Sequence, residues 1–148
     1  MSISLASISK TTRNSLPPRV VIHGDGGVGK TTFAAGAYKP IFLPFEDGLS
    51  GIEAEAFPLL KTYAEAMEAI TTLVKEDHSY GTVVVDSLDW AEPLVWQKVA
   101  KEAGKRSIEE IPYGKGYAEA LPLWRDFLDG LNHLREHKGM AVVLIAHS

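Results

Sequence analysis

The segment with the clearest chemistry is residues 24–31, GDGGVGKT, which matches the phosphate-loop pattern G-x-x-x-x-G-K-[ST]. Glycines let the backbone wrap an anion with its N–H groups turned inward. A helix that begins near Lys30 directs the positive end of its dipole toward the same anion. The lysine contacts β- and γ-phosphate oxygens, and the Thr31 hydroxyl binds Mg²⁺. The predicted nucleotide-binding residues are Gly24, Asp25, Gly26, Gly27, Val28, Gly29, Lys30, Thr31 and Thr32, with ATP and Mg²⁺ as ligands.

The second candidate site is an acidic residue that follows the phosphate loop in the sequence. The apolar run at residues 82–86, TVVVD, ends in Asp86, which is the Walker B pattern. A carboxylate at the end of such a strand holds the Mg²⁺ shell directly or through water. We therefore predict that Thr31 and Asp86 together bind the metal.

The residue that activates water is expected elsewhere. Many P-loop ATPases carry a catalytic glutamate directly after this aspartate, but Ser87 stands there. Hydrolysis still needs a group that orients the attacking water. Glu46, just after a second apolar run at residues 41–45, is the predicted substitute, and Asp47 is the alternative. Ligands bind at the carboxyl ends of parallel strands, so Glu46, Asp86 and the phosphate loop are expected to share one rim.

A fourth apolar run, residues 140–146, ends in His147. If this strand lies between the first and the third, His147 comes to lie beside the phosphate loop. It would then sense the γ-phosphate through a hydrogen bond. An ordinary histidine at a strand end is the alternative. The predicted catalytic residues are Glu46, Lys30 and His147.

The elements that position these residues alternate between strands and helices along the chain. Short apolar runs predict strands, and apolar residues at helical spacing predict helices. The alternation favours an α/β fold with a parallel sheet covered by helices on both faces. A flexible tail is predicted over residues 1–18 and the folded core over 19–148. Strands are predicted at 19–23 (buried), 41–45, 82–86 and 140–146, and helices at 30–38, 63–75, 88–103 and 117–137, with a loop at 105–117.

Composition narrows the class of protein. With 148 residues, 45% hydrophobic and 23% charged, the chain fits one globular domain. The net charge of −4 argues against binding polyanions through bulk charge, so any contact with nucleic acid requires a local basic patch. The chain has no cysteine, which excludes disulfides, thiolate zinc sites and cysteine nucleophiles. No apolar run is long enough to span a bilayer, and no signal peptide is evident, so a cytoplasmic location is expected.

The constellation resembles the RecA/RadA-like recombinase ATPases, most closely their small phage-type members, which act in single-strand annealing. The resemblance rests on residues 24–31, 45–49, 83–87 and 143–147. It implies a RecA-like P-loop NTPase core, a catalytic glutamate after the second strand, and a fourth strand between the first and third. It also implies a ring or filament of identical subunits. Further core strands and a second DNA-binding loop would follow Ser148, so the core is expected to be C-terminally incomplete.

The same resemblance places a first DNA-binding loop between residues 105 and 117. Basic charge with interleaved aromatic rings is typical of sequence-tolerant single-strand binding, and a plain solvated loop is the alternative. The predicted function is ATP hydrolysis on single-stranded DNA in recombination or annealing. The alternatives are a nucleotide switch, a small-molecule kinase or a DnaB-type helicase motor, although the scattered arginines disfavour a kinase lid. The predicted DNA-binding residues are Lys105, Arg106, Tyr113, Lys115 and Tyr117.

Overall fold

A five-stranded, all-parallel sheet in the order β1-β5-β4-β2-β3 forms the centre of the protein. The structure is a computed structural model that describes residues 2–11, 16–49 and 51–148. The last strand lies between the first strand and β4, which confirms the predicted insertion. The strands are β1 Arg19–Gly24, β2 Pro40–Pro44, β3 Glu55–Ala56, β4 Thr82–Asp86 and β5 Ala141–His147.

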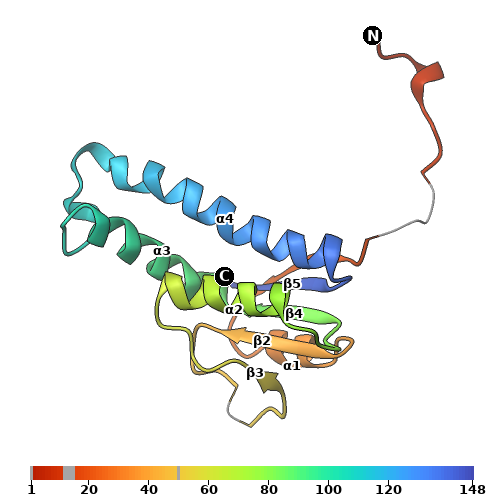
Figure 1. Cartoon of the computed structure of the whole chain (residues 1–148), viewed down its shortest axis with the longest axis horizontal. Helices are drawn as coiled ribbons and strands as arrows, with labels where there is room; N and C mark the ends of the chain where they lie inside the picture. The colour runs from red at the N-terminus through yellow and green to blue at the C-terminus, as the bar shows by residue number, and fades with distance from the viewer. Residues whose placement is uncertain (1, 12–15, 50) are drawn as a thin grey trace.

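Helices cover both faces of this sheet, as predicted, but unequally (Figure 1). Three helices pack on one face, where the alternate strand residues Val83 and Val85 point. The short helix α1 covers the other face, where Ala34 packs against Val84 and Phe42. The helices are α1 Lys30–Ala35, α2 Tyr63–Lys75, α3 Leu88–Glu102 and α4 Lys115–His137.

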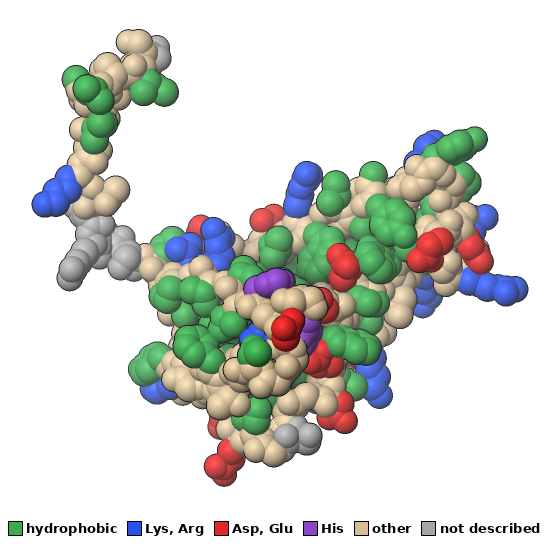
Figure 2. All heavy atoms as spheres, turned by 180° about the vertical axis from the view of Figure 1, so that it is seen from behind, with side chains coloured by type: hydrophobic (Ala, Val, Ile, Leu, Met, Phe, Trp, Pro, Cys, Tyr) green, Lys and Arg blue, Asp and Glu red, His purple; other side chains and the backbone are tan. Residues whose placement is uncertain are grey.

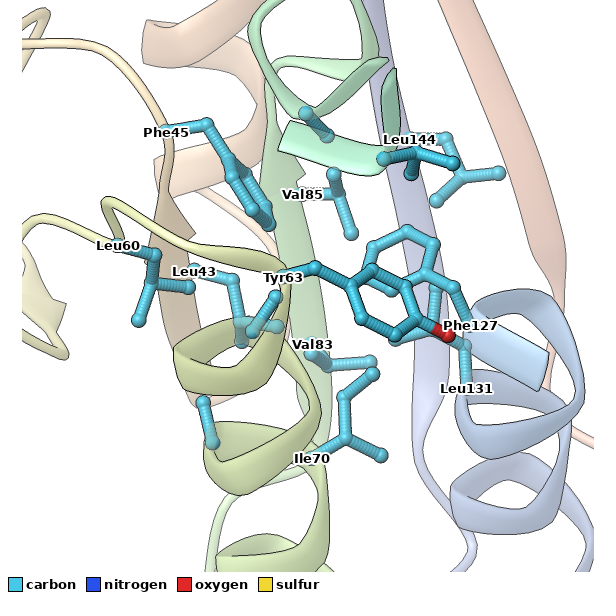
Figure 3. Packing of buried hydrophobic residues seen from close by; sticks show 14 of the residues in the cluster. Leu43, Phe45, Leu60, Tyr63, Ile70, Val83, Val85, Phe127, Leu131 and Leu144 are labelled. Carbon is cyan, nitrogen blue, oxygen red and sulfur yellow. The ribbon is translucent and has the colours of Figure 1, made fainter. Parts of the chain in front are cut away.

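The larger core fixes the end of β2, from which Glu46 projects. Phe45 is buried and meets the Phe127 ring edge-on, with a centroid distance of 6.1 Å. The Tyr63 hydroxyl donates a 2.9 Å hydrogen bond to the Leu123 carbonyl, which ties α2 to α4 above the sheet. Figure 3 shows these aromatic rings converging over Val83 and Val85. Burial, with the nearby Asp126 charge, raises the pKa of Tyr63 to about 12, so the phenol keeps its proton.

The first strand differs from the prediction of a buried strand. Val21 is 61% exposed, and Val20 is exposed as well. The reason is position: β1 pairs with β5 on one side, and its outer edge meets no other strand in the described part of the chain. Its apolar sequence alone does not distinguish an edge strand from a central one.

Three other local features differ from what the sequence indicates. The first helix ends at Ala35, not Tyr38, because the chain turns at Gly36 and reaches φ +42° at Lys39. The two-residue strand β3 was not predicted, since its pairing with Ile41 and Phe42 depends on the sheet rather than on its own sequence. On α4, Leu121 and Leu128 belong to an apolar stripe at helical spacing, yet both side chains are exposed. The buried residues of that helix are Gly116, Ala120, Phe127, Leu131 and Leu134.

The segment at residues 105–117, predicted to be a loop, is largely ordered. It contains two 3-10 helices, Ile108–Glu110 and Pro112–Gly114, and α4 already begins at Lys115. Ile108 is buried against the first turn of α4. A Cβ on Gly116 would lie 2.6 Å from Ile108 Cγ1, so this close approach requires glycine. The result is a compact tip on the hairpin of α3 and α4 (Figure 1).

Residues 2–11 extend away from the sheet (Figure 1). Within them, Leu5–Ser7 forms a 3-10 helix. Pro17 and Pro18 lie against the folded part, since the Pro17 carbonyl accepts a 2.6 Å hydrogen bond from Arg135 Nε and the Pro18 carbonyl a 3.0 Å hydrogen bond from the Val142 amide. Residues 1 and 12–15 of the predicted tail lie outside the described residues. The division into tail and core stays a prediction.

Replacing Gly116 with valine tests the packing of the tip. Gly116→Val should lower the free energy of unfolding by about 1–3 kcal/mol, because the new methyl groups overlap Ile108. The exposed Ala118, on the same helix turn, provides a matched control. Ala118→Val should cost only its helix propensity, about 0.5 kcal/mol. Urea denaturation measures both, and equal effects would contradict the close approach.

Candidate nucleotide-binding site

The phosphate loop connects β1 to α1. Gly27 and Gly29 have φ values of +81° and +97°, a left-handed region that a side chain would strain. The Phe33 amide donates to the Gly29 carbonyl at 2.8 Å, so the first helical turn follows the loop directly. The backbone therefore has the conformation that the sequence pattern predicts.

Lys30 lies inside the loop instead of reaching out from it. Its side chain is buried, and Nζ donates 2.6 Å hydrogen bonds to the carbonyl oxygens of Gly24 and Asp25. These bonds offset the cost of burying the ammonium group. Asp25, Val28 and Thr32, also predicted to bind nucleotide, are exposed around it.

The side chains of Thr31 and Asp86 meet at the carboxyl edge of the sheet, and their joint binding of Mg²⁺ stays a prediction. The Thr31 hydroxyl donates to Asp86 Oδ2 at 2.9 Å. Asp86 is only 2% exposed, and its Oδ1 alone, among buried side-chain polar atoms of the described residues, has no hydrogen-bond partner. Burial raises the pKa of Asp86, against the lowering effect of the Thr31 hydroxyl. An unpaired carboxylate oxygen beside a hydroxyl is a donor set that fits Mg²⁺.

The Glu46 carboxylate is contacted through both of its oxygens. Ser87 Oγ donates to Oε2 at 3.1 Å, and His147 Nε2 lies 3.3 Å from Oε1. The Phe45 amide donates to the Asp86 carbonyl at 2.8 Å, which holds the end of β2 against β4. Glu46, Asp86 and the phosphate loop therefore lie on one rim, which confirms the expected placement.

His147 lies at the end of β5, next to the phosphate loop. It is in register with Gly24, and the Ser148 amide donates to the Gly24 carbonyl at 3.1 Å. The His147 amide donates to Asp89 Oδ1 at 2.7 Å. The sequence predicts His147 beside the loop only if its strand lies between the strands at 19–23 and 82–86. This holds, because β5 lies between β1 and β4.

Sequence reasoning missed two residues of the rim, Ser87 and Asp89. Ser87 was noted only as the residue in place of a glutamate, and Asp89 only as part of a helix. A serine directly after a strand is a typical helix N-cap, and that signal points toward its own helix rather than toward Glu46. Their contacts join segments that are distant in the chain.

A cavity of about 550 Å³ opens beside Glu46. Apolar rings and acidic groups share its wall, and Asp47 lies on it without joining the hydrogen bonds of Glu46. The lining residues are Phe45, Glu46, Asp47, Leu59, Trp90 and His147.

The predicted DNA-binding residues lie apart from this rim, at the outer end of the hairpin of α3 and α4 (Figure 1). Tyr113 is 95% exposed. Tyr117 instead meets the Trp96 ring edge-on, at a centroid distance of 5.7 Å. Lys115 and Tyr117 belong to the first turn of α4 and not to a loop. Figure 2 shows both basic and acidic side chains at this end of the molecule.

Asp86→Asn tests the buried carboxylate. Because burial disfavours the ionised acid, the variant without nucleotide should unfold at the same or a higher temperature than the wild type at neutral pH. The wild type should approach the variant as the pH falls and Asp86 takes up a proton. The variant should also lose the increase in Tm that Mg²⁺ adds in the presence of ATP. Calorimetric melting measures each change, and a marked loss of stability without ligand would contradict the unpaired Oδ1.

Within residues 2–11, 16–49 and 51–148, no helix has the length and apolar character that crossing a membrane requires.

Two comparisons show what this chain is similar to. The SPbeta prophage-derived uncharacterized protein YorG of Bacillus subtilis (strain 168) is 26% identical over 137 residues, 87% of this chain and 40% of that protein. The chain thus spans about 40% of the length of this curated relative. A family model described as "AAA domain" matches residues 16–148, which include the phosphate loop, both carboxylates and His147. The chain therefore belongs to the AAA domain family, a family of the P-loop ATPase type.

Proposed function

We propose that this chain is the core of a RecA-like, Mg²⁺-dependent ATPase that acts on single-stranded DNA in recombination or strand annealing. One observation carries the ATPase part of the proposal: Glu46, from the end of β2, lies on the same rim as the Thr31–Asp86 pair and the phosphate loop. A nucleotide switch needs the loop and the metal ligands. A glutamate held beside them supplies the group that hydrolysis requires.

The phosphate loop and Lys30 would hold the triphosphate. Backbone N–H groups of the glycine-rich turn face the anion, and the Lys30 ammonium exchanges the Gly24 and Asp25 carbonyls for phosphate oxygens. Thr31 and Asp86 would hold Mg²⁺. When bound, the metal neutralises charge on the β- and γ-phosphate oxygens.

Glu46 would orient the attacking water and accept its proton. Its carboxylate lies on the wall of the cavity, where water has access. His147, within hydrogen-bond reach of the same carboxylate, would contact the γ-phosphate. Asp47 remains the alternative base.

Glu46→Gln should keep the affinity for Mg-ATP and lower the hydrolysis rate about 10²–10⁴-fold, the usual contribution of a general base. The amide preserves the size of the side chain and its contact with Ser87, and removes only the proton acceptor. Titration calorimetry with a slowly hydrolysed ATP analogue measures binding, and phosphate release measures hydrolysis. Asp47→Asn is the matched control, with wild-type turnover expected. The reverse result would move the base to Asp47.

The DNA part of the proposal concerns the tip of the hairpin. Lys105, Arg106 and Lys115 supply positive charge, and Tyr113 presents an almost fully exposed ring. Tyr113 also has φ +60°, which is uncommon for an aromatic residue and is more often found at functional sites. A ring held outward beside lysines suits stacking on an unpaired base while the backbone phosphates meet the charges. Assembly into a ring or filament would align several tips along one strand.

Lys115→Ala should reduce the salt dependence of oligo-dT binding by about one unit of log–log slope, because one phosphate contact is lost. Tyr113→Ala should weaken binding by about 1–3 kcal/mol, the usual value of a stacked base. Fluorescence anisotropy at several salt concentrations, with ATP present, measures both. The exposed Lys75, at the end of α2, provides a matched control, and Lys75→Ala should change neither quantity.

An ATPase assay with and without single-stranded DNA separates the candidate functions. Stimulation by DNA that disappears in a quadruple alanine variant of Lys105, Arg106, Tyr113 and Lys115 supports the proposal. If that variant binds single strands like the wild type, the tip is an ordinary surface and the DNA role fails, while the ATPase role stands.

A further inference from the structure

We infer, on the basis of the proposed ATPase activity, that Ser87 is a positioning residue that fixes the orientation of the Glu46 carboxylate. In this chain the serine that replaces a glutamate after Asp86 holds a glutamate from the neighbouring strand. The proposal stands on where the Ser87 hydroxyl points, on the second contact of Glu46, and on the freedom that the carboxylate would otherwise have.

The Ser87 hydroxyl is directed away from its own helix. Ser87 is the N-cap residue of α3, a position where a serine side chain normally accepts a hydrogen bond from the first turn. Here the side chain makes no such bond and donates instead to Glu46 Oε2 at 3.1 Å. The residue is 0% exposed, so water does not compete for the hydroxyl. The helix gives up a cap, and the carboxylate gains a fixed donor.

The second oxygen of Glu46 has its own partner. His147 Nε2 lies 3.3 Å from Oε1, and the His147 amide donates to Asp89 Oδ1 at 2.7 Å. Ser87 and Asp89 both lie at the start of α3, so one helix end contacts both members of the Glu46–His147 pair. Asp89 acts on Glu46 only through the position of the β5 end.

Two contacts are needed because the last torsion of a glutamate side chain is loose. The carboxylate plane rotates over a broad, roughly two-fold range when nothing restrains it. One hydrogen bond leaves rotation about the bonded oxygen, whereas bonds to both oxygens fix the plane. A base that orients water must direct a lone pair along one line, and a misplacement of about 1 Å can cost about 10²-fold in rate.

Ser87→Ala tests the inference, because it removes a hydroxyl and leaves the backbone and the packing volume nearly unchanged. The single-turnover rate of ATP hydrolysis, with protein in excess, should fall roughly 10- to 100-fold. The calorimetric affinity for Mg-ATP should stay within twofold of the wild type. Ser87→Thr keeps the hydroxyl and should restore most of the rate.

Thr82→Val is the matched control at the opposite end of β4. Thr82 is also buried, and its hydroxyl donates to the Tyr38 carbonyl at 2.7 Å, away from the nucleotide site. Its loss should lower the Tm and leave the hydrolysis rate unchanged. If a general loss of stability slowed hydrolysis, the rate would fall in Thr82→Val as much as in Ser87→Ala.

A double variant separates positioning from an independent role. If Ser87 acts through Glu46, Ser87→Ala should slow Glu46→Gln no further. A further slowing by the same factor would overturn the inference, and so would a wild-type rate in Ser87→Ala while Glu46→Gln is slow. Those results leave the proposed function standing. Wild-type hydrolysis by Glu46→Gln would instead remove the assigned base, and the positioning role with it.

Discussion

Parallel pairing of β5 with β1 on one side and β4 on the other determines the geometry of the whole site. Parallel strands all end at the same edge of a sheet, so this insertion brings Gly24, Asp86 and His147 together. The rim forms from segments that are distant in the chain, and each contact across it depends on this strand order. Thr31 reaches Asp86, and His147 reaches Glu46, only because β5 fills the position between β1 and β4.

Two buried charged groups at this rim differ in how fully hydrogen bonds compensate them. Lys30 is compensated, since its ammonium group donates hydrogen bonds to two loop carbonyls. Asp86 is only half compensated, with Thr31 on one oxygen and nothing on the other. A buried carboxylate without a full set of donors costs stability, which is reflected in its raised pKa. The protein retains this cost at the position where a divalent cation would remove it, as expected for a binding site rather than for a structural core.

The local patterns predicted what depends on local sequence. α2 runs from Tyr63 to Lys75 as predicted, because Thr62 caps it through the Glu65 amide and its apolar spacing is helical. The exposure of β1 was not predictable, since an edge and a central strand share the same apolar sequence. The order of the 105–117 segment was missed because Ile108 is buried only once α4 leaves room at Gly116. Ser87 was missed because its hydrogen-bond partner is 41 residues away.

Helix α3 joins the two regions to which the proposed function assigns roles, the rim and the tip. Its first residues hold the Glu46 carboxylate and the end of β5, and its last turn leads into the tip with Lys105 and Arg106. A helix of 15 residues spans about 22 Å, so single-stranded DNA bound at the tip, as proposed, would not touch Glu46. Under that proposal, an effect of DNA on hydrolysis within one subunit would be transmitted by a movement of this helix or of its neighbour α4. Because Ser87 and Asp89 lie at the first turn of α3, a small displacement of that helix changes both contacts of the carboxylate together.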